Sequence, residues 1–308
     1  MATTLIRRLQ EHHAGAGLTL LTAPAFAGLF RHWQGLRVVA FPRKGAMWQT
    51  LRWVRGERFD RIYDLQSSDR SALLCALSGA PERVGNHPRF PYTHHPPDRY
   101  RGQCHIFERM NQVLASAGVE PAAPQPHLPI AEEEREAVLE WVRWQGLEAG
   151  RFVVCHAGAS PRWVSKRWPH FAALATALAE RGLPCVWAGS EVDEALNRQL
   201  ADQAGIDATA RFSLPQLAEL GRQARFAVTT DSAPMHVLSA SGIPVYALFG
   251  PTDWRRNHAL GQAERVLYRE LDCSPCSLEA CPPERGHACL AGITVEQVLE
   301  RLQEDGLI

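Results

Sequence analysis

Long hydrophobic runs are missing from this sequence of 308 residues. The longest apolar stretches, such as residues 245–249, are far shorter than the roughly 18 residues that a membrane-spanning helix requires. No long apolar segment follows Arg7 and Arg8 near the N-terminus, which argues against a secretory signal. We therefore expect a cytoplasmic protein that touches a membrane at its surface at most.

Lysine is also scarce: only Lys44 and Lys166 stand beside 31 arginines. The net charge of zero hides an uneven division of charge along the chain. Residues 1–130 carry 16 Lys+Arg and 9 Asp+Glu, a net of +7, whereas residues 131–308 carry 17 and 24, a net of −7. The basic half suits an anionic ligand, although arginines that merely solvate the surface explain it equally well. The arginines do not predict a nucleic-acid partner, because no recognised binding motif accompanies them.

Four of the eight cysteines lie close together as C-x2-C-x4-C-x7-C, namely Cys273, Cys276, Cys281 and Cys289. Four thiolates can hold a structural zinc ion, but standard zinc modules repeat C-x2-C twice, and here the second pair is stretched. A folded loop with free thiols is the favoured alternative, since disulfides are rare in a reducing cytoplasm. Zinc at this cluster is the weaker of the two hypotheses.

From Arg151 onward, short apolar runs alternate with helical patterns. Strands are predicted at 152–155, 183–188, 226–229 and 243–249, and helices at 169–181, 192–204, 214–223 and 234–241. Apolar strands joined by helices predict an α/β fold: a doubly wound, Rossmann-like domain whose parallel sheet is covered on both faces. Ligands bind beyond the carboxyl ends of the strands in such sheets.

Residues 1–130 show a weaker form of the same alternation. Strands are predicted at 18–21, 37–40 and 61–65, and helices at 26–32, 47–55, 71–77 and 103–117. A proline-rich linker at 121–129 then precedes a helix predicted at 132–145. We therefore place one domain at residues 1–130 and another at 131–308.

The beginning of the chain is unusual for such a fold. An amphipathic helix is predicted at residues 4–12, whereas doubly wound domains usually begin with a central strand. The expected first strand is absent. Either another segment fills its place, or the reading frame begins late and lacks this strand and the loop after it.

Three predicted strand ends carry residues that suit a phosphate. The first is His156-Ala157-Gly158-Ala159-Ser160, with Lys166 a little further on. Small residues let a ligand approach the backbone, while Ser160 offers a hydroxyl and Lys166 a positive charge. A plain surface loop with one basic residue is the alternative.

The other two strand ends are T-T-D-S-A-P-M-H at 229–236 and L-F-G-P-T-D at 248–253. Asp231 or Ser232 can cap a helix whose free amides favour anionic oxygen, and His236 lies one turn into that helix. Capping alone would explain the first of these segments, and a buried histidine is commoner than a ligand-binding one. Three such ends side by side favour a ligand site.

These segments together carry a resemblance. The series G-A-S…K-R-W-P at 158–169, T-D-S-A-P-M-H at 230–236 and L-F-G-P-T-D at 248–253 resembles glycosyltransferase family 9, the ADP-heptose:lipopolysaccharide heptosyltransferases. Asp64-Leu65-Gln66, His105…Arg109 and the cysteine pattern add to the resemblance, which covers nearly the whole chain. It implies a GT-B architecture, in which two Rossmann-like domains face each other across a cleft. Residues 1–130 would bind the acceptor and residues 131–308 the nucleotide sugar, with the last helix packing back on the first domain.

The resemblance also implies an inverting transfer of heptose from ADP-heptose to the lipopolysaccharide inner core, with no cofactor required. The acceptor would be a Kdo-bearing lipid A core, whose phosphates and carboxylates suit a basic domain. Such an acceptor implies peripheral contact with the inner face of the inner membrane. The oligomeric state stays open.

Residue by residue, the resemblance places these side chains on the donor: Ser160, Lys166, Glu191, Asp231, Ser232, Ala233 and His236. Lys166 and His236 would serve catalysis at the departing diphosphate, and Gln66 and Arg70 would lie on the acceptor side. The general base of the family, an aspartate in a Gly-Asp loop after the first strand, has no match in this sequence. Two hypotheses follow, an active transferase and a nucleotide-sugar or glycolipid binder that transfers poorly.

Overall fold

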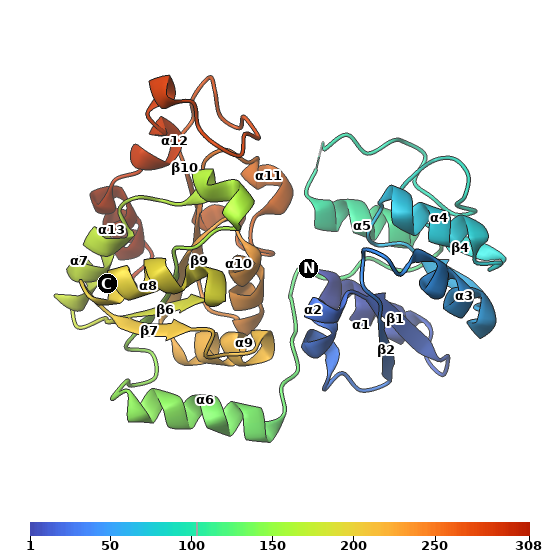
Figure 1. Cartoon of the computed structure of the whole chain (residues 1–308), viewed down its shortest axis with the longest axis horizontal. Coiled ribbons are helices and arrows are strands. Elements are labelled where there is room, and N and C mark those ends of the chain that lie inside the picture. Colours follow the sequence, from blue (N-terminus) through green and yellow to red (C-terminus); the bar gives the residue numbers. More distant parts are fainter. Residues whose placement is uncertain (103) are drawn as a thin grey trace. The chain divides into compact units, whose positions relative to one another are not determined.

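The chain divides into two units, Met1–His127 and Leu128–Ile308, in the computed structural model, which describes residues 1–102 and 104–308 (Figure 1). The division falls in the proline-rich segment 121–129. Within the described ranges, none of the helices combines the length and the hydropathy that crossing a membrane takes.

The second unit is built on one six-stranded sheet. Its strands are β5 (Val153–His156), β6 (Cys185–Gly189), β7 (Ile206–Thr209), β8 (Phe226–Thr230), β9 (Val245–Phe249) and β10 (Val266–Tyr268). They lie in the order β10-β9-β8-β5-β6-β7, and every pairing is parallel. All residues of β5, β8 and β9 are buried, as expected of strands that are covered on both faces.

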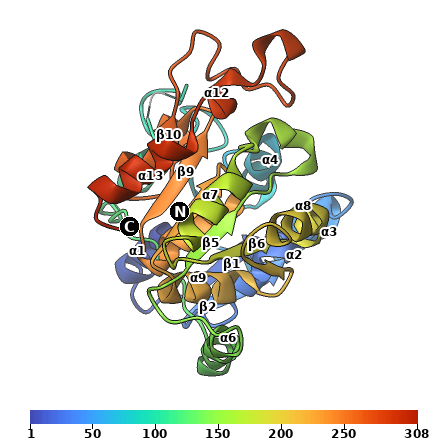
Figure 2. The same cartoon turned by 90° about the vertical axis from the view of Figure 1, so that its left-hand side faces the viewer.

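Helices cover both faces of this sheet, because successive strand residues point to opposite sides. Val153 and Cys155 share one core cluster with residues of α7 (Phe171–Ala179) and α13 (Val295–Glu304). Val154 points to the opposite face and belongs to a second core cluster, which it shares with residues of α6 (Glu132–Trp144), α9 (Leu214–Gln223) and α10 (Ala233–Leu238). Figure 2 shows α7 and α13 on the one face, and α9 and α6 on the other.

The last helix, α13, packs against α7 inside its own unit. Its packing on the first unit stays a prediction. The remaining helices of the second unit are short: η2 (Pro161–Lys166), η3 (Glu191–Asp193), α8 (Glu194–Ala201), η4 (Ser239–Ser241), α11 (Trp254–Asn257), η5 (Ala263–Arg265), η6 (Pro283–Arg285) and α12 (Ala288–Ala291).

The α/β fold with a parallel sheet is confirmed, and the strands and helices predicted for this unit are present, with ends that differ by up to three residues. The two edge strands, β7 and β10, are the strands of this unit that the sequence does not predict, and it does not predict several of the short helices, such as η2, α11 and α12. The two strands are short, and β7 carries the exposed Asp207 in its middle. An edge strand pairs on one side alone, so its sequence need not be continuously apolar.

The first unit has the same alternation in a smaller form. Its elements are α1 (Ala2–His12), β1 (Leu18–Thr22), α2 (Pro24–Ala27), η1 (Gly28–Phe30), β2 (Leu36–Ala40), α3 (Met47–Glu57), β3 (Arg61–Tyr63), α4 (Asp69–Leu77), β4 (Glu82–Val84) and α5 (Ile106–Ala115). β1 pairs with β2 and β3 with β4, both in parallel, and among residues 1–102 and 104–127 no strand joins the two pairs. The helix predicted at 103–117 begins at Ile106, while Gln103 lies outside the described residues.

The strand β3 ends at Tyr63 for a local reason. The carboxylate of Asp64 accepts the backbone N–H groups of Gln66 and Ser67, both at 3.0 Å, and this turn replaces ladder hydrogen bonds. Ser67 consequently has a φ of 56°. The chain is thereby turned from the carboxyl end of β3 toward α4.

Replacing Gly205 by alanine should destabilise the second unit. Gly205 has a φ of 106°, and a Cβ there would lie 2.5 Å from the carbonyl oxygen of Cys185. Both the backbone conformation and the contact oppose a side chain, so we expect a loss of about 3 kcal/mol in the free energy of unfolding. Urea titration followed by tryptophan fluorescence would measure it.

The matched control is Gly182→Ala, because Gly182 has a φ of 74° but open space around its Cβ position. This substitution should lower the free energy of unfolding by about 1 kcal/mol, because only the backbone conformation opposes a side chain there. Equal losses in the two variants would contradict the steric argument.

Candidate active site

The strand order of the second unit reverses between β5 and β8. From β5 the chain proceeds outward to β6 and β7, then returns to β8 on the other side of β5 and continues outward to β9 and β10. The segments that leave β5 and β8 therefore diverge, and in sheets of this kind ligands bind in the crevice outside the carboxyl ends at such a point. Residues 157–160 and 231–233, two of the three predicted segments, lie at this point.

An ion pair connects all three predicted segments. The ammonium of Lys166, at the end of η2, donates to Oδ2 of Asp231 at 2.6 Å. The hydroxyl of Thr252, just beyond β9, donates to the same oxygen at 2.7 Å. The two charged side chains are 19% and 10% exposed, so the pair is reachable from solvent yet only weakly screened.

An aromatic ring supports the ammonium from another side. The Nζ atom of Lys166 lies 5.3 Å from the centre of the Trp163 ring, within range for a cation–π contact. Trp163 belongs to the same 3₁₀ segment, where its φ and ψ of −121° and 48° interrupt the helical path. The sequence does not single out Trp163 or Thr252, although Thr252 stands inside the third predicted segment.

His156 forms a buried link beneath this edge of the sheet. It ends β5, is 3% exposed, and its Nδ1 lies 3.0 Å from the hydroxyl of Ser232. Burial lowers the pKa of His156 to about 4, since the carboxylate of Asp193, 3.9 Å from Nε2, only partly opposes the loss of hydration. The imidazole is therefore neutral at physiological pH.

Two glycines make room for the Asp193 carboxylate. A Cβ on Gly158 or on Gly189 would overlap the Asp193 side chain, so both positions require glycine. Oδ2 of Asp193 accepts the backbone N–H of Ser190 at 3.0 Å and its hydroxyl at 3.1 Å. The carboxylate thus fixes the turn that follows β6 and packs against Gly158 in the turn that follows β5.

The other predicted donor residues lie along the same edge of the sheet. Ser160 is exposed at the start of η2, and Glu191 is exposed at the start of η3, after the neighbouring strand β6. Ala233 is exposed at the first position of α10, and His236 is half-buried one turn later. The structure therefore places the predicted donor residues after three neighbouring strands, β8, β5 and β6, while their roles stay predictions.

On the acceptor side, the structure gives Arg70 and Gln66 structural contacts. The guanidinium of Arg70 donates to the Pro42 carbonyl at 3.3 Å and to the Thr50 hydroxyl at 3.5 Å, which holds the loop before α3. Gln66 is exposed, and its backbone N–H donates to the carboxylate of Asp64 in the turn after β3. Their contact with an acceptor stays a prediction.

The four clustered cysteines do not form a metal centre in the part of the chain that the structure describes. No group of three or more His, Cys, Asp or Glu side chains there is arranged to hold an ion. Zinc at Cys273, Cys276, Cys281 and Cys289 therefore has no support. Their segment is shaped instead by hydrogen bonds to the loops beside Lys166 and beyond β9.

Three of these hydrogen bonds tie the cysteine-rich segment to the site. The hydroxyl of Ser165 donates to the Leu278 carbonyl at 3.0 Å, and Nε2 of His287 donates to the Ser165 carbonyl at 2.5 Å. The hydroxyl of Ser274 donates to the Gly250 carbonyl at 2.6 Å. The segment therefore supports the backbone on either side of the Lys166–Asp231–Thr252 cluster.

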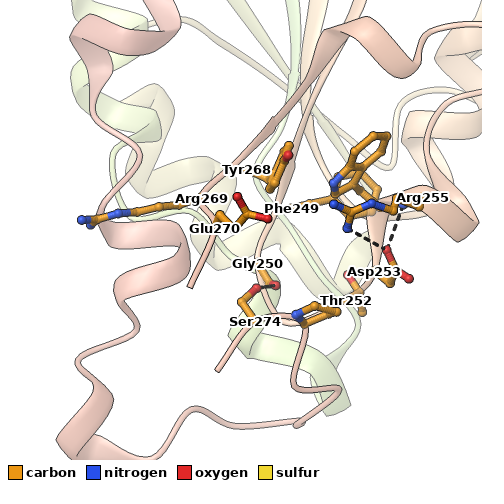
Figure 3. Close-up of a pocket in the computed structure, with 11 residues that line it drawn as sticks. Phe249, Gly250, Thr252, Asp253, Arg255, Tyr268, Arg269, Glu270 and Ser274 are labelled. Atoms are coloured by element: carbon orange, nitrogen blue, oxygen red, sulfur yellow. Dashed lines mark hydrogen bonds and ion pairs between the residues drawn. The ribbon is translucent and has the colours of Figure 1, made fainter. Parts of the chain in front are cut away.

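A small cavity closes the site beyond β9 and β10 (Figure 3). Its volume of about 30 Å³ is enough for about one water molecule. Thr252 lines it, together with Arg255, whose guanidinium lies 5.0 Å from the Trp254 ring and 5.9 Å from the Tyr268 ring. The cavity is therefore too small for a larger ligand.

Comparison with known proteins adds sequence similarity to this geometry. The sequence profile of glycosyltransferase family 9 (heptosyltransferase) matches residues 46–286. Lipopolysaccharide heptosyltransferase 1 of Pseudomonas aeruginosa is 28% identical over 259 residues, which are 76% of this chain and 69% of that protein.

Solved structures share the fold at lower sequence identity. The glycosyl transferase family 9 protein of Veillonella parvula superposes with a TM-score of 0.82 at 22% identity, over 98% of this chain and 91% of that one. The E. coli heptosyltransferase WaaC, solved with ADP-2-deoxy-2-fluoro heptose, gives a TM-score of 0.69 at 19% identity, over 98% and 94%. Both likenesses establish the fold.

The neutrality of His156 should make the protein less stable in mild acid. Because its pKa is lowered from 6.5 to about 4, the unfolded chain binds more protons than the folded chain between these values. Stability is therefore unaffected by this group above pH 6.5 and falls as the pH drops from 6.5 toward 4. From pH 7 to pH 5 we expect this group to remove about 2 kcal/mol from the free energy of unfolding.

Urea unfolding at the two pH values would measure the effect, with His156→Asn as the control. Asparagine keeps a polar atom near the Nδ1 position but does not titrate, so this variant should lose about 2 kcal/mol less than the parent over the same pH interval. An identical pH dependence of the two proteins would contradict the assignment to His156.

Proposed function

This chain belongs to glycosyltransferase family 9, the heptosyltransferase family, and we propose that it transfers heptose from ADP-heptose to the lipopolysaccharide inner core. Its membership makes it a glycosyltransferase. The relative from P. aeruginosa is named a lipopolysaccharide heptosyltransferase, and the E. coli structure carries an ADP-heptose analogue. The observation that carries the proposal is the cluster of Lys166, Asp231 and Thr252 at the strand-order reversal.

The diphosphate of the donor would bind beside Lys166. An ammonium can donate three hydrogen bonds, and Asp231 accepts one of them, so the cation can serve a phosphate oxygen at the same time. The small residues Ala157, Gly158 and Ala159 let phosphate oxygens approach the backbone after β5. Ser160, Ser232 and Ala233 border the same space with a hydroxyl and backbone amides.

Asp231 would face the sugar rather than the phosphates. A carboxylate only accepts hydrogen bonds, so it repels phosphate oxygen and attracts the hydroxyl groups of a heptose. Thr252 and Lys166 both donate to Oδ2, which leaves Oδ1 for a sugar hydroxyl. Glu191, after β6, would lie on the far side of the diphosphate, where the ribose of the nucleotide would bind.

Catalysis would come from stabilising the departing diphosphate. Negative charge grows on the β-phosphate as the bond to the sugar breaks, and a fixed ammonium stabilises that charge more strongly than the charge of the bound substrate. His236, one turn into α10, would add a further polar group there. No divalent ion is invoked for this step.

The acceptor would bind the first unit, whose residues carry the net charge of +7. An inverting transfer also needs a base to take the proton of the acceptor hydroxyl. Asp64, at the carboxyl end of β3, is not assigned this role: it is 4% exposed and accepts hydrogen bonds from Gln66, Ser67 and the Tyr92 hydroxyl. The second candidate is a protein that binds the nucleotide sugar but transfers it slowly, because this sequence has no match for the Gly-Asp loop that carries the base in the resembling family.

Lys166→Ala should lower turnover by roughly 100- to 1,000-fold, because the ammonium acts mainly on the charge that develops in the transition state. Donor binding should weaken less than turnover. Calorimetry with ADP and a product assay with ADP-heptose and a Kdo-bearing lipid A acceptor would separate the two quantities.

The control for this experiment is Arg181→Ala, which removes a cation at the far end of α7. It should leave both quantities unchanged. Unchanged turnover of Lys166→Ala at saturating donor would reject the catalytic role. Donor binding by the parent protein without any product would favour the second candidate.

Thr252→Val should weaken donor binding by about tenfold, because Asp231 would lose a hydrogen bond that orients it without any change in side-chain size. Thr252→Ser keeps the hydroxyl and should restore most of the affinity. Measured dissociation constants for ADP-heptose would test this. Equal affinities of the valine and serine variants would show that the hydroxyl is not needed.

A further inference from the structure

An unusually exposed tryptophan stands on α3 of the first unit. Trp48 is 81% exposed, although a side chain of this size gains considerable free energy when it leaves water. Leu73 and Leu77, on α4, are 47% and 38% exposed. Isolated apolar side chains on a surface are common, so the arrangement of these three decides whether they matter.

The three side chains belong to two adjacent helices. Arg55, in the last turn of α3, donates to the Leu77 carbonyl at 3.5 Å, and Arg70, at the start of α4, donates to Thr50 near the start of α3 at 3.5 Å. The helices therefore run in the same direction, and they lie side by side (Figure 1). We define the α3–α4 face by its exposed residues Trp48, Arg52, Arg55, Leu73 and Leu77.

The spacing of these residues agrees with a single outward face. On α3, positions 48, 52 and 55 follow the i, i+4, i+7 repeat, whereas Thr50, Leu51 and Val54 are buried. On α4, positions 73 and 77 are one turn apart, whereas Leu74 and Cys75 are buried. Apolar and cationic side chains therefore share the outward side of α3, while the outward side of α4 carries Leu73 and Leu77 with the exposed Asp69 one turn before them.

The charge around this face is positive. Residues 42–58 and 69–77 contain six cations, Arg43, Lys44, Arg52, Arg55, Arg58 and Arg70, and two carboxylates, Glu57 and Asp69. Glu57 is already neutralised by Arg37, which donates to both of its oxygens at 2.8 Å. A partner for this face should therefore be anionic and should accept apolar side chains.

We propose that the α3–α4 face docks on the surface of an anionic phospholipid bilayer. Tryptophan favours the level of the lipid headgroups, and arginines beside it attract acidic headgroups while their stems lie along apolar surface. The inference extends the proposed function. Both helices begin beyond the carboxyl ends of strands, α3 after β2 and α4 after β3, the edge at which a lipid-linked acceptor would be received.

A second exposed tryptophan shows what such a side chain looks like without the positive surroundings. Trp144 is 80% exposed at the end of α6 in the second unit. That helix contains Glu132, Glu133, Glu134, Glu136 and Glu140. Acidic surroundings would repel an anionic bilayer, so Trp144 is the matched control.

Flotation of the full chain with vesicles tests the proposal. The parent protein should float with phosphatidylcholine–phosphatidylglycerol vesicles and not with phosphatidylcholine alone, and binding should weaken as salt rises. Trp48→Ala should lower the partition coefficient by about tenfold, and Arg52→Gln by about fivefold at low salt. Trp144→Ala should bind as the parent does.

Several results would overturn the proposal. They are unchanged flotation of Trp48→Ala, an equal loss in Trp144→Ala, and binding to neutral vesicles as strong as to anionic ones. If the parent protein does not float, and light scattering shows that it is a dimer which Trp48→Ala converts to a monomer, the α3–α4 face would instead bind a second copy of the chain. Calorimetry of Trp48→Ala with ADP checks that the second unit is intact. If this variant binds ADP but no longer floats, the loss of flotation is due to the α3–α4 face and not to the nucleotide-sugar site.

Discussion

The reversal of strand order between β5 and β8 is the constraint on which the candidate site depends. It separates the two segments that leave the centre of the sheet, and between them the chain can present backbone amides and side chains to a ligand. Lys166 and Asp231 come from these two segments, and their 2.6 Å contact is the direct result. Thr252 joins them because β9 is the next strand beyond β8.

Support for this site comes from buried polar groups and not from the sheet alone. Asp193 fixes the turn after β6 through Ser190, and Gly158 and Gly189 provide the space for its side chain. His156 stays neutral beneath Ser232 since its burial outweighs the nearby carboxylate. The cysteine-rich segment fixes the opposite side through Ser165 and Ser274. The candidate site is thus held in place by contacts that do not depend on a bound ligand, as the proposed stabilisation of a leaving diphosphate would require.

The two units differ in charge. The first unit carries the excess of basic residues and the exposed α3–α4 face, and the second carries the acidic helix α6 and Lys166 of the candidate site. An anionic, lipid-linked acceptor suits the first unit, while a single well-placed cation suits a diphosphate that must leave. Membership of the heptosyltransferase family connects these two requirements in one reaction.

The sequence alone determined the alternation of strands and helices, the parallel sheet and the segments at 156–166, 229–236 and 248–253, because periodicity and strand-end residues are local properties. The family resemblance rested on those same segments. The short edge strands β7 and β10, the contact of Thr252 with Asp231 and the ring of Trp163 beside Lys166 depend on strand order and loop paths. Only the tertiary structure could decide these features. It also shows that, among the described residues, the four cysteines are not arranged to hold a metal ion, because spacing along a chain does not fix the distances between side chains.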